Sequence, residues 1–262
     1  MIGRCLRQAL LLVPCLLLPL AGAADEPCRR LTATGNPEYP PYLWRDPQNP
    51  QQLIGANADL LKYLGKQLGL DIDFVYVGPW SRAQEEVRTG RIDLMAGYFL
   101  TEARRQQMDF IAPPFLHTPS VVWVRRDNAF AYRQWADLKG RKGGTLVSNS
   151  HGQQFDEYAQ ANLTLEAVPS ARQAFEKLMH KRSDYVVYEQ YPGMALARTL
   201  GITDTLQVLE PPVSSEGLYL AMSHESPCNK PQLREALARE MAKIVSGALP
   251  EQLLQQNLER WQ

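Results

Sequence analysis

Residues Gly90–Phe110 read GRIDLMAGYFLTEARRQQMDF, and the interpretation of the whole chain starts from them. Gly90 is typical of a residue that ends a helix, and the apolar run Ile92–Ala96 predicts a short strand. A polar cap at Thr101 then predicts a new helix. In an open α/β sheet a ligand lies outside the carboxyl ends of the strands, so this turn places Arg104 where an anion can bind. Its planar guanidinium suits a carboxylate because it donates two parallel hydrogen bonds.

The same residues carry a family resemblance. Gly90 and Asp93 precede the pattern A-G-x-x-x-T-x-x-R-x-x-x-x-D-F, which spans Ala96–Phe110. This arrangement resembles the bacterial extracellular solute-binding proteins of family 3, which serve polar amino-acid ABC importers. The resemblance implies an α/β, two-lobed periplasmic-binding-protein fold of type II, with a ligand cleft between lobes joined by a two-strand hinge. In the family, the positions of Gly97 and Phe99 contact the ligand and often carry hydroxyls, which are absent here.

The first 24 residues predict a signal peptide. Arg4 and Arg7 form a positive n-region, Ala9–Leu20 an apolar region, and Ala21–Ala23 a small-residue cleavage site. The apolar region is too short to span a bilayer comfortably, and no later run is long enough for a membrane helix. We therefore expect a soluble periplasmic protein whose mature chain begins near Ala24.

The cysteines predict a disulfide. Cleavage would leave Cys28 and Cys228, which lack the C-x-x-C spacing of metal and redox sites. In an oxidising compartment such a pair more often forms a disulfide, so we expect the two to be bonded. Cys15 follows Pro14 rather than the small residues that precede an acylated cysteine, which disfavours a lipoprotein.

Charge and histidine content limit the class of protein. The chain carries 28 basic and 28 acidic residues, and loss of Arg4 and Arg7 would leave 26 and 28, a net charge of −2. A nucleic-acid site would need a clustered basic surface, so no nucleic-acid partner is expected. The four histidines show no metal-ligand spacing, and we expect neither a metal nor a cofactor. We expect a monomer with two domains, for which the length is sufficient.

Two aromatic residues are candidates for the apolar faces of the pocket. Tyr39 lies in the loop Gly35–Tyr42, which three prolines stiffen. Trp80 follows Gly78 and Pro79. In the family, an aromatic residue at the position of Tyr39 stacks on the ligand, and the position of Trp80 often supplies the second face. Either ring could instead only cover the core.

Apolar spacing predicts the surrounding elements. One helix is expected from the leucines between Asn57, its predicted N-cap, and Gly69, its predicted end. Ser170 is expected to cap another helix. Further apolar stripes predict further helices. The last of these is a short helix from Pro250 toward Trp261. Three separate strands are also expected: Val121–Val124, Leu206–Leu209 and, as the return crossing, Gly217–Met222.

The second half of the chain supplies the opposing side of the pocket. The polar turn Ser148–Gly152 precedes a helix near Gln153, and it leaves amide N–H groups that can bind an anion. Relative to the family, His151 and Gly152 keep these backbone donors but lack the usual hydroxyls. Glu189 ends an apolar strand that resembles the family's D-A-V-V-x-D strand, whose last acid contacts the ligand's α-amino group. Glu is one methylene longer than the usual Asp.

Two crossings between alternating strands and helices predict two α/β lobes. We expect a signal peptide at 1–24, a first lobe at 25–119 and 214–262, and a second lobe at 120–213. A zwitterionic ligand would join Arg104 to Glu189 and hold the lobes closed. The resemblance therefore implies a non-enzymatic receptor that captures an amino acid or related small polar solute and delivers it to an ABC permease.

Two other functions stay open. The protein could sense a ligand and signal to a membrane partner. It could also be a dehydratase-like enzyme, with Glu189 or His151 as a general acid. Among ligands, a neutral or aromatic amino acid is favoured over arginine or lysine, because basic amino-acid receptors of the family tend to carry an acid where this chain has Asn36.

Overall fold

The computed structural model of this protein describes residues 28–261. The predicted signal peptide, residues 1–24, lies outside the described residues. Between residues 28 and 261, none of the helices combines the length and the apolar character that a membrane crossing requires.

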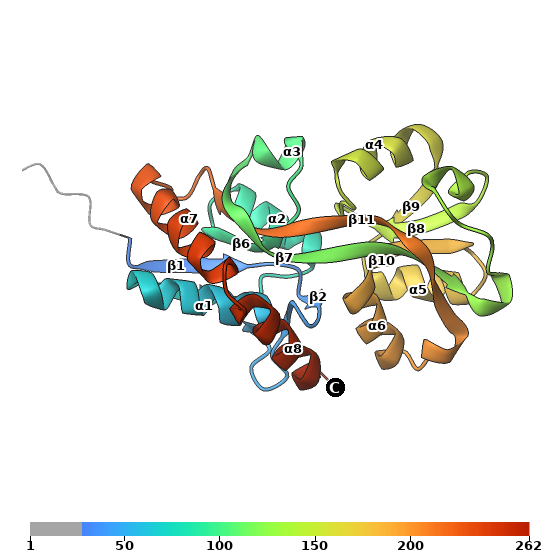
Figure 1. The fold of residues 1–262 in the computed structure, drawn as a ribbon, viewed down its shortest axis with the longest axis horizontal. Coiled ribbons are helices and arrows are strands. Elements are labelled where there is room, and N and C mark those ends of the chain that lie inside the picture. Colours follow the sequence, from blue (N-terminus) through green and yellow to red (C-terminus); the bar gives the residue numbers. More distant parts are fainter. Residues whose placement is uncertain (1–27, 262) are drawn as a thin grey trace, which may run out of the picture.

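One eight-stranded sheet runs through the molecule in the order β5-β1-β6-β11-β7-β10-β8-β9 (Figure 1). We call the part with β5, β1 and β6 the first lobe, and the part with β10, β8 and β9 the second lobe. The long strands β7 and β11 are antiparallel neighbours that belong to both. The strand bounds are β1 Arg30–Thr34, β5 Asp71–Phe74, β6 Leu94–Tyr98, β7 Met108–Arg125, β8 Lys142–Leu146, β9 Thr164–Val168, β10 Tyr185–Glu189 and β11 Leu206–Ser223. The two-lobed fold is therefore confirmed.

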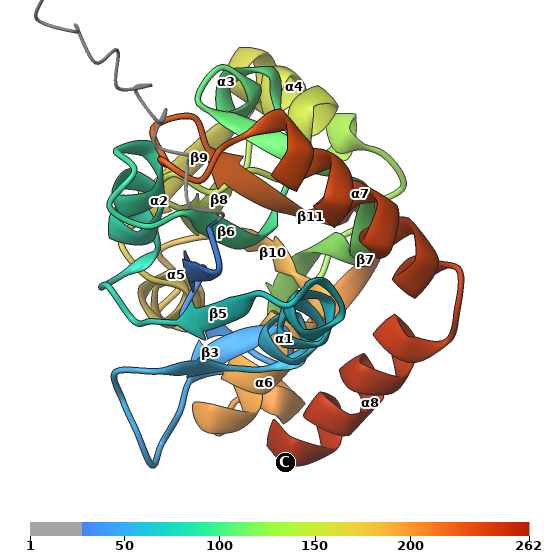
Figure 2. The ribbon, with the colours of Figure 1, turned by 90° about the vertical axis from the view of Figure 1, so that its left-hand side faces the viewer.

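Helices cover both faces of the sheet in the first lobe. Figure 2 shows α1, α7 and α8 gathered on one side of its strands and α2 on the other. The apolar stripes of α1, α7 and α8 pack into one core, and Trp80 of α2 packs with Met95 of β6 into another. The helix bounds are α1 Ala56–Leu68, α2 Trp80–Arg88, α3 Glu102–Arg105, α7 Pro231–Val245 and α8 Leu249–Trp261. A small antiparallel sheet of β2 (Glu38–Tyr39), β3 (Leu43–Arg45) and β4 (Leu53–Ile54) lies beside them.

The second lobe repeats this layered arrangement. Phe155 of α4 lies in the core on one face, and Phe175 of α5 lies in the core on the other, together with α6. The bounds are α4 Gln153–Asn162, α5 Ala171–Met179 and α6 Gln190–Thr199, with 3-10 turns η1 Arg126–Asn128, η2 Trp135–Leu138 and η3 Thr203–Thr205. Each lobe thus has its own hydrophobic core, as independently packed units require.

The crossing strands differ from the prediction of three short strands. Val121–Val124 is the end of β7, and Leu206–Leu209 and Gly217–Met222 are parts of one strand, β11. Four of the five prolines in these strands lie where the β7–β11 pairing is irregular, and the fifth, Pro119, lies opposite Ser215. Proline lacks an N–H donor, so it fits at such a break in the ladder without a lost hydrogen bond. The four prolines at these breaks are Pro113, Pro114, Pro211 and Pro212.

The expected lobe boundaries, 119/120 and 213/214, fall inside β7 and β11. The pairing of these strands shifts between Leu209 and Ser214, and Ser214 lies opposite Ser120. A shift in pairing is a natural place for two strands to flex. We therefore keep these boundaries as a proposal for the hinge.

Of the helix ends predicted from Gly69, Ser170 and Asn57, the first two were right and the third was wrong. Gly69 ends α1 with a left-handed φ of 67°, and the Ser170 hydroxyl accepts from Gln173 N at 3.3 Å. Asn57 is not the N-cap of α1. The N-cap lies two residues earlier, at Gly55, and the Asn57 amide instead donates to Ala96 O at 3.1 Å. The Asn57 side chain is thus held by a buried carbonyl group of β6, and this hydrogen bond competes with capping of the helix.

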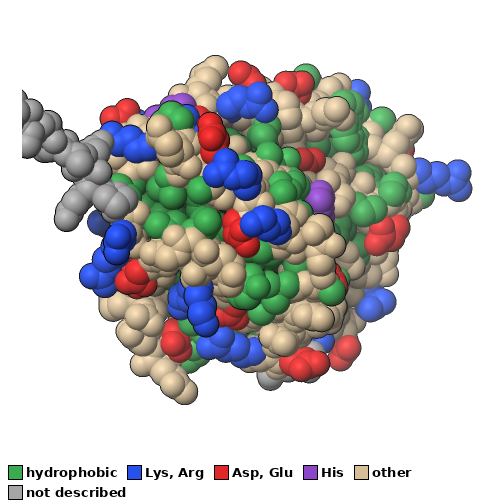
Figure 3. Space-filling view, turned by 60° about the vertical axis from the view of Figure 1, so that its left-hand side comes forward, with side chains coloured by type: hydrophobic (Ala, Val, Ile, Leu, Met, Phe, Trp, Pro, Cys, Tyr) green, Lys and Arg blue, Asp and Glu red, His purple; other side chains and the backbone are tan. Residues whose placement is uncertain are grey.

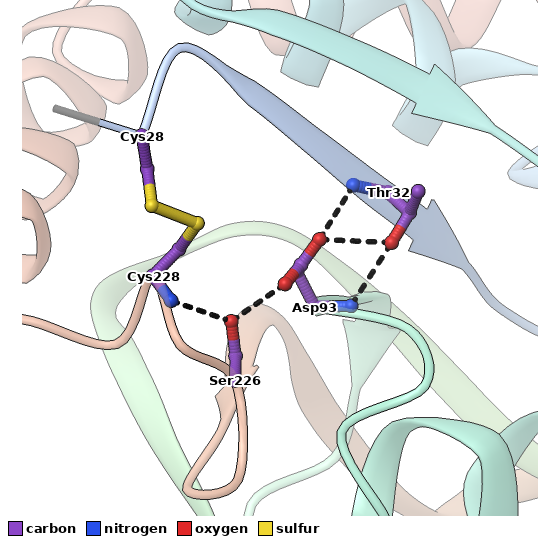
Figure 4. Close-up of a disulfide and its surroundings, with 5 residues drawn as sticks. All are labelled: Cys28, Thr32, Asp93, Ser226 and Cys228. Carbon is purple, nitrogen blue, oxygen red and sulfur yellow. Dashed lines mark hydrogen bonds between the residues drawn. A yellow bond between two sulfur atoms is a disulfide. The ribbon is translucent and has the colours of Figure 1, made fainter. Parts of the chain in front are cut away.

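The predicted disulfide between Cys28 and Cys228 is present (Figure 4). Beside it, the Asp93 carboxylate accepts from Thr32 N and Oγ1, both at 2.8 Å, and from Ser226 Oγ at 2.6 Å. Ser226 Oγ in turn accepts from Cys228 N at 3.1 Å. Asp93 of the family motif therefore fastens β1 to the segment that carries the disulfide.

The surface fits the near-neutral composition. On the face of the molecule shown in Figure 3, basic and acidic side chains are interspersed among apolar ones. Mixed charges of this kind produce no large single-sign field on that face.

Candidate functional site

A small cavity between the lobes brings together six of the predicted ligand contacts. Its volume is about 20 Å³, which is about the room that one water molecule needs. Four further residues complete its wall. The predicted residues that line it are Tyr39, Trp80, Gly97, Phe99, Arg104 and Glu189, and the others are Asn36, Tyr98, Asn149 and Leu218.

Arg104 reaches this cavity from α3 of the first lobe. The Thr101 hydroxyl accepts from Arg104 N at 3.3 Å, so the predicted polar cap starts this helix. The guanidinium donates to Phe99 O at 3.0 Å and to Ser148 O, in the second lobe, at 3.3 Å. Its carbon lies 3.9 Å from the centroid of the Tyr98 ring, a cation–π contact. Burial lowers the pKa of Arg104, but an arginine stays charged at neutral pH.

Glu189 ends β10 of the second lobe and is 1% exposed. Its Oε1 accepts from Asn149 Nδ2 at 3.2 Å, while Oε2 has no hydrogen-bond partner within residues 28–261. Burial raises the pKa of Glu189 to about 7. A buried carboxylate oxygen without a donor is costly, so the site is arranged to receive a donor from a ligand or to hold a proton.

The two aromatic candidates reach the cavity wall from different elements of the first lobe. Tyr39, in β2, packs with its ring centroid 5.2 Å from that of Tyr42. Trp80 begins α2 and meets the Tyr98 ring edge-on at 5.6 Å. Its indole Nε1 is buried and has no partner in the described part of the chain. Both rings are core residues on one side and cavity walls on the other, which fits the dual use of large aromatics.

Gly97 shows why this chain lacks a hydroxyl at that position. Its φ is 91°, and a Cβ there would lie 2.4 Å from Asn57 Nδ2. That amide is held by Ala96 O, so a side chain at Gly97 would displace it. Two residues along, Phe99 is 5% exposed and directs its carbonyl oxygen to Arg104.

His151 and Gly152 do not line the cavity. The His151 ring lies between Thr145 Oγ1, at 2.8 Å, and Ser120 Oγ, at 3.2 Å. His151 N donates to Asp156 Oδ1 at 2.9 Å, so this amide of the predicted anion site is already used. Gly152 N donates to a serine hydroxyl of the same turn at 3.2 Å. A ligand contact of either residue stays a prediction.

The environment of His151 bears on the enzyme alternative. Burial, followed by the nearby Arg104 charge, lowers the pKa of His151 to about 3. The imidazole is therefore neutral near pH 7 and holds no acidic proton to donate as an imidazolium. Of the two general acids considered, only Glu189 has a pKa suited to that role.

Sequence analysis missed three residues of the cavity wall, Tyr98, Asn149 and Leu218. Tyr98 occupies a variable position of the family motif, so the pattern gave no signal for it. Asn149 lies in the polar turn before α4, where the sequence drew attention to backbone groups rather than to side chains. Within residues 28–261, no group of three His, Cys, Asp or Glu side chains is arranged to hold a metal ion.

A larger hollow of about 220 Å³ lies elsewhere between the lobes. Its walls include Trp44, Pro192, Leu196 and Trp261. Among the described residues, no buried side-chain atom without a partner belongs to this wall. The smaller cavity is therefore the better candidate for a polar ligand.

Comparison with known proteins places the chain among binding proteins. The family model described as "Bacterial extracellular solute-binding proteins, family 3" matches residues 31–259. A curated relative, the probable ABC transporter extracellular-binding protein YckB of Bacillus subtilis (strain 168), is 19% identical over 161 residues. That alignment covers 62% of this chain and 55% of the relative.

Two solved structures share the fold. A mutant of ArgBP from T. maritima has a TM-score of 0.71 and 19% identity, and the match covers 88% of this chain and 96% of the other. A histidine kinase sensor domain with similarity to periplasmic binding proteins has a TM-score of 0.72 and 23% identity, with 87% and 95% covered.

Proposed function

Because this chain belongs to the bacterial extracellular solute-binding proteins of family 3, we propose that it is a periplasmic receptor for an amino acid or a related small zwitterion. One observation carries the proposal. Arg104 of the first lobe and Glu189 of the second lobe line the same buried cavity, and Glu189 Oε2 has no partner among the described residues. A ligand with a carboxylate and an ammonium group matches both, in charge and in hydrogen bonding.

The ligand would have to open the cavity. At about 20 Å³ it has room for one water molecule but not for an amino acid. Arg104 would also have to release Ser148 O to hold a ligand carboxylate with its planar fork. Binding therefore begins from a more open arrangement and ends with a ligand that contacts both lobes.

We propose delivery of this ligand to an ABC permease. The relationship to an extracellular-binding protein of an ABC transporter supports this role, and the similarity to a histidine kinase sensor domain favours ligand sensing as the alternative. Genes for a permease and an ATPase beside this one would support import. Ligand uptake by vesicles that contain the permease, dependent on this protein, is the direct measurement.

A thermal-shift screen of the purified mature chain tests the proposal. The set should include the common amino acids, small carboxylates and small amines, with arginine present because of the ArgBP similarity. A ligand at 100 times its Kd stabilises the native state by about 2.7 kcal/mol. For a protein of this size the midpoint should rise by roughly 5 to 10 °C. Stabilisation by compounds with only one of the two charged groups, and by no amino acid, would contradict a zwitterion site.

Glu189 also favours a second candidate, a dehydratase-like enzyme. Its pKa of about 7 and its unpartnered oxygen suit a general acid, and Arg104 would hold the substrate's carboxylate. The test is incubation with prephenate, followed by NMR detection of phenylpyruvate, which forms when prephenate loses water and carbon dioxide. Turnover that Glu189→Gln abolishes would establish the enzyme, and absence of turnover leaves the receptor.

A further inference from the structure

The turn Leu146–Asn149 presents an unusual backbone group to the first lobe. Ser148 has a φ of 60°, a left-handed conformation that costs free energy in a residue other than glycine. Asn149 N donates to Leu146 O at 3.2 Å, which closes the turn. In this conformation the Ser148 carbonyl oxygen accepts hydrogen bonds from two side chains of the first lobe.

Gln84 and Arg104 are those two donors. Gln84 Nε2, from α2, lies 3.2 Å from Ser148 O, and Arg104 Nη2 lies 3.3 Å from it. One carbonyl oxygen has two lone pairs and can accept both bonds. One backbone atom of the second lobe therefore accepts hydrogen bonds from two side chains of the first lobe.

Tyr98 determines how Gln84 is oriented. The Tyr98 hydroxyl donates to Gln84 Oε1 at 2.7 Å, so the amide oxygen faces Tyr98 and the amide nitrogen faces Ser148. The same tyrosine ring underlies the Arg104 guanidinium. Tyr98 thus positions both donors, although its own hydroxyl makes no contact across the lobes.

We propose that Gln84, oriented by Tyr98, is a positioning residue that latches the second lobe onto the first when no ligand is bound. Arg104 is shared between this latch and the ligand, whereas Gln84 can hold Ser148 O in both states. The latch does not depend on which ligand the receptor takes. Gln84 and Tyr98 lie beside the residues proposed to bind the carboxylate and the ammonium group of the ligand. A rim contact, from Glu102 N to Gln153 Oε1 at 3.2 Å, adds to it where α3 faces α4 (Figure 1).

The latch should be weak enough to open. A neutral hydrogen bond between protein groups contributes modestly because water competes for both partners. Loss of the Gln84 bond should therefore raise the ratio of open to closed molecules by about 2- to 10-fold. Loss of the Tyr98 hydroxyl should have a smaller effect, because it orients the donor but leaves it in place.

Small-angle scattering of the ligand-free mature protein tests the latch without knowledge of the ligand. The variants are Gln84→Met, which has similar length and no donor, and Tyr98→Phe. Gln160→Met, at an exposed position of α4, is the matched control. Circular dichroism and a cooperative melt establish that each variant is folded. We expect a larger radius of gyration for Gln84→Met, an intermediate value for Tyr98→Phe, and the wild-type value for Gln160→Met. Equal radii for wild type and Gln84→Met would overturn the proposal, and a failure to bind any amino acid would not affect it.

Discussion

Arg104 provides the clearest test of whether the cavity binds a ligand. Besides its bond to Ser148 O, it contacts Phe99 O and the Tyr98 ring within its own lobe, so its guanidinium stays held when a ligand takes the place of Ser148 O. Such preorganisation reduces the entropy lost on binding. The sequence alone does not predict how Arg104 is held, because the contacts with Phe99 O and the Tyr98 ring come from positions that the family motif leaves variable.

We predict that Arg104→Ala weakens ligand binding by a factor of about 30 to several thousand. Removing one partner of a buried, hydrogen-bonded charge pair costs about 2 to 5 kcal/mol. Arg104→Lys should also be strongly impaired, because a point charge does not reproduce the planar fork. Isothermal titration with the ligand from the screen measures both.

The control for this prediction is Arg105→Ala. Arg105 is the next residue of the same helix and is exposed, and it does not line the cavity. It should bind like the wild type. Wild-type affinity in Arg104→Ala would remove the basis for an amino-acid ligand.

Glu189 should make the stability of the ligand-free protein depend on pH. Its pKa is raised from 4.5 to about 7 in the folded state. Between these values the folded protein keeps a proton that the unfolded chain has released, so stability falls as pH rises through this window and stays lower above it. From the size of the shift, the contribution of this group is on the order of 3 kcal/mol.

Urea unfolding at several pH values between 4.5 and 8 measures this effect. In Glu189→Gln the decline with rising pH should be smaller by the contribution of this group. Glu235→Gln, at an exposed position of α7, should keep the wild-type decline. Parallel profiles for wild type and Glu189→Gln would mean that Glu189 is not held protonated in the folded state.

Among the elements, those with an uninterrupted pattern were predicted well. The apolar stripe of α7 and the final helix α8 follow from the 3.6-residue period, and their buried residues pack as expected. β7 and β11 were predicted only in fragments, because prolines break the period that identifies a strand. Each strand continues past its prolines because it pairs with the partner strand on both sides of them, and the local sequence does not encode that pairing.

The family motif turns out to contribute as much to assembly of the first lobe as to the cavity. Asp93 binds β1 and the disulfide segment, and Asp109 accepts from Asn229 Nδ2 at 2.9 Å in the same segment. A Cβ at Gly90 would lie 2.7 Å from Glu225 O, so only glycine allows this close approach. The sequence pattern could not separate these structural residues from Arg104, since all of them recur with the same motif.

We predict that loss of Asp93 and loss of the disulfide are energetically coupled. The double change Cys28→Ser with Cys228→Ser should lower the free energy of unfolding by about 2 to 4 kcal/mol, because the bond closes a long loop. Asp93→Ala leaves partly buried donors unsatisfied and should cost a comparable amount. Because Ser226 links the two features, the combined change should differ from the sum by about 0.5 to 3 kcal/mol.

Urea unfolding of the four proteins in this cycle gives the coupling directly. Asp71→Ala is the control, since Asp71 forms an exposed ion pair with Arg30 on the neighbouring strand. It should cost no more than about 1 kcal/mol and add independently to disulfide loss. Strict additivity for Asp93→Ala would show that the Ser226 link does not transmit the effect.

The molecule as a whole combines separate hydrophobic cores in each lobe with a shared pair of strands, so we expect the lobes to move while each stays folded. Sequence patterns predicted these lobes, because each has its own alternation of helices and strands. They did not predict how tightly the lobes meet. The bonds to Ser148 O and the bond from Tyr188 OH to Glu38 O, at 3.2 Å, join residues far apart in the chain. Such contacts depend on the closed arrangement and leave no local signal.

A ligand that bridges the lobes should compact a molecule whose latch has been removed. Ligand-free Gln84→Met is expected to be more open than the wild type, since it lacks one bond to Ser148 O. A zwitterion that contacts both Arg104 and Glu189 favours the closed state by its extra affinity for it, and so should restore a compact shape. In scattering at saturating ligand, the decrease in radius of gyration should be larger for Gln84→Met than for the wild type. A variant that binds the ligand tightly but stays extended would show that the ligand lies within one lobe, because a ligand without contacts to both lobes cannot shift this equilibrium.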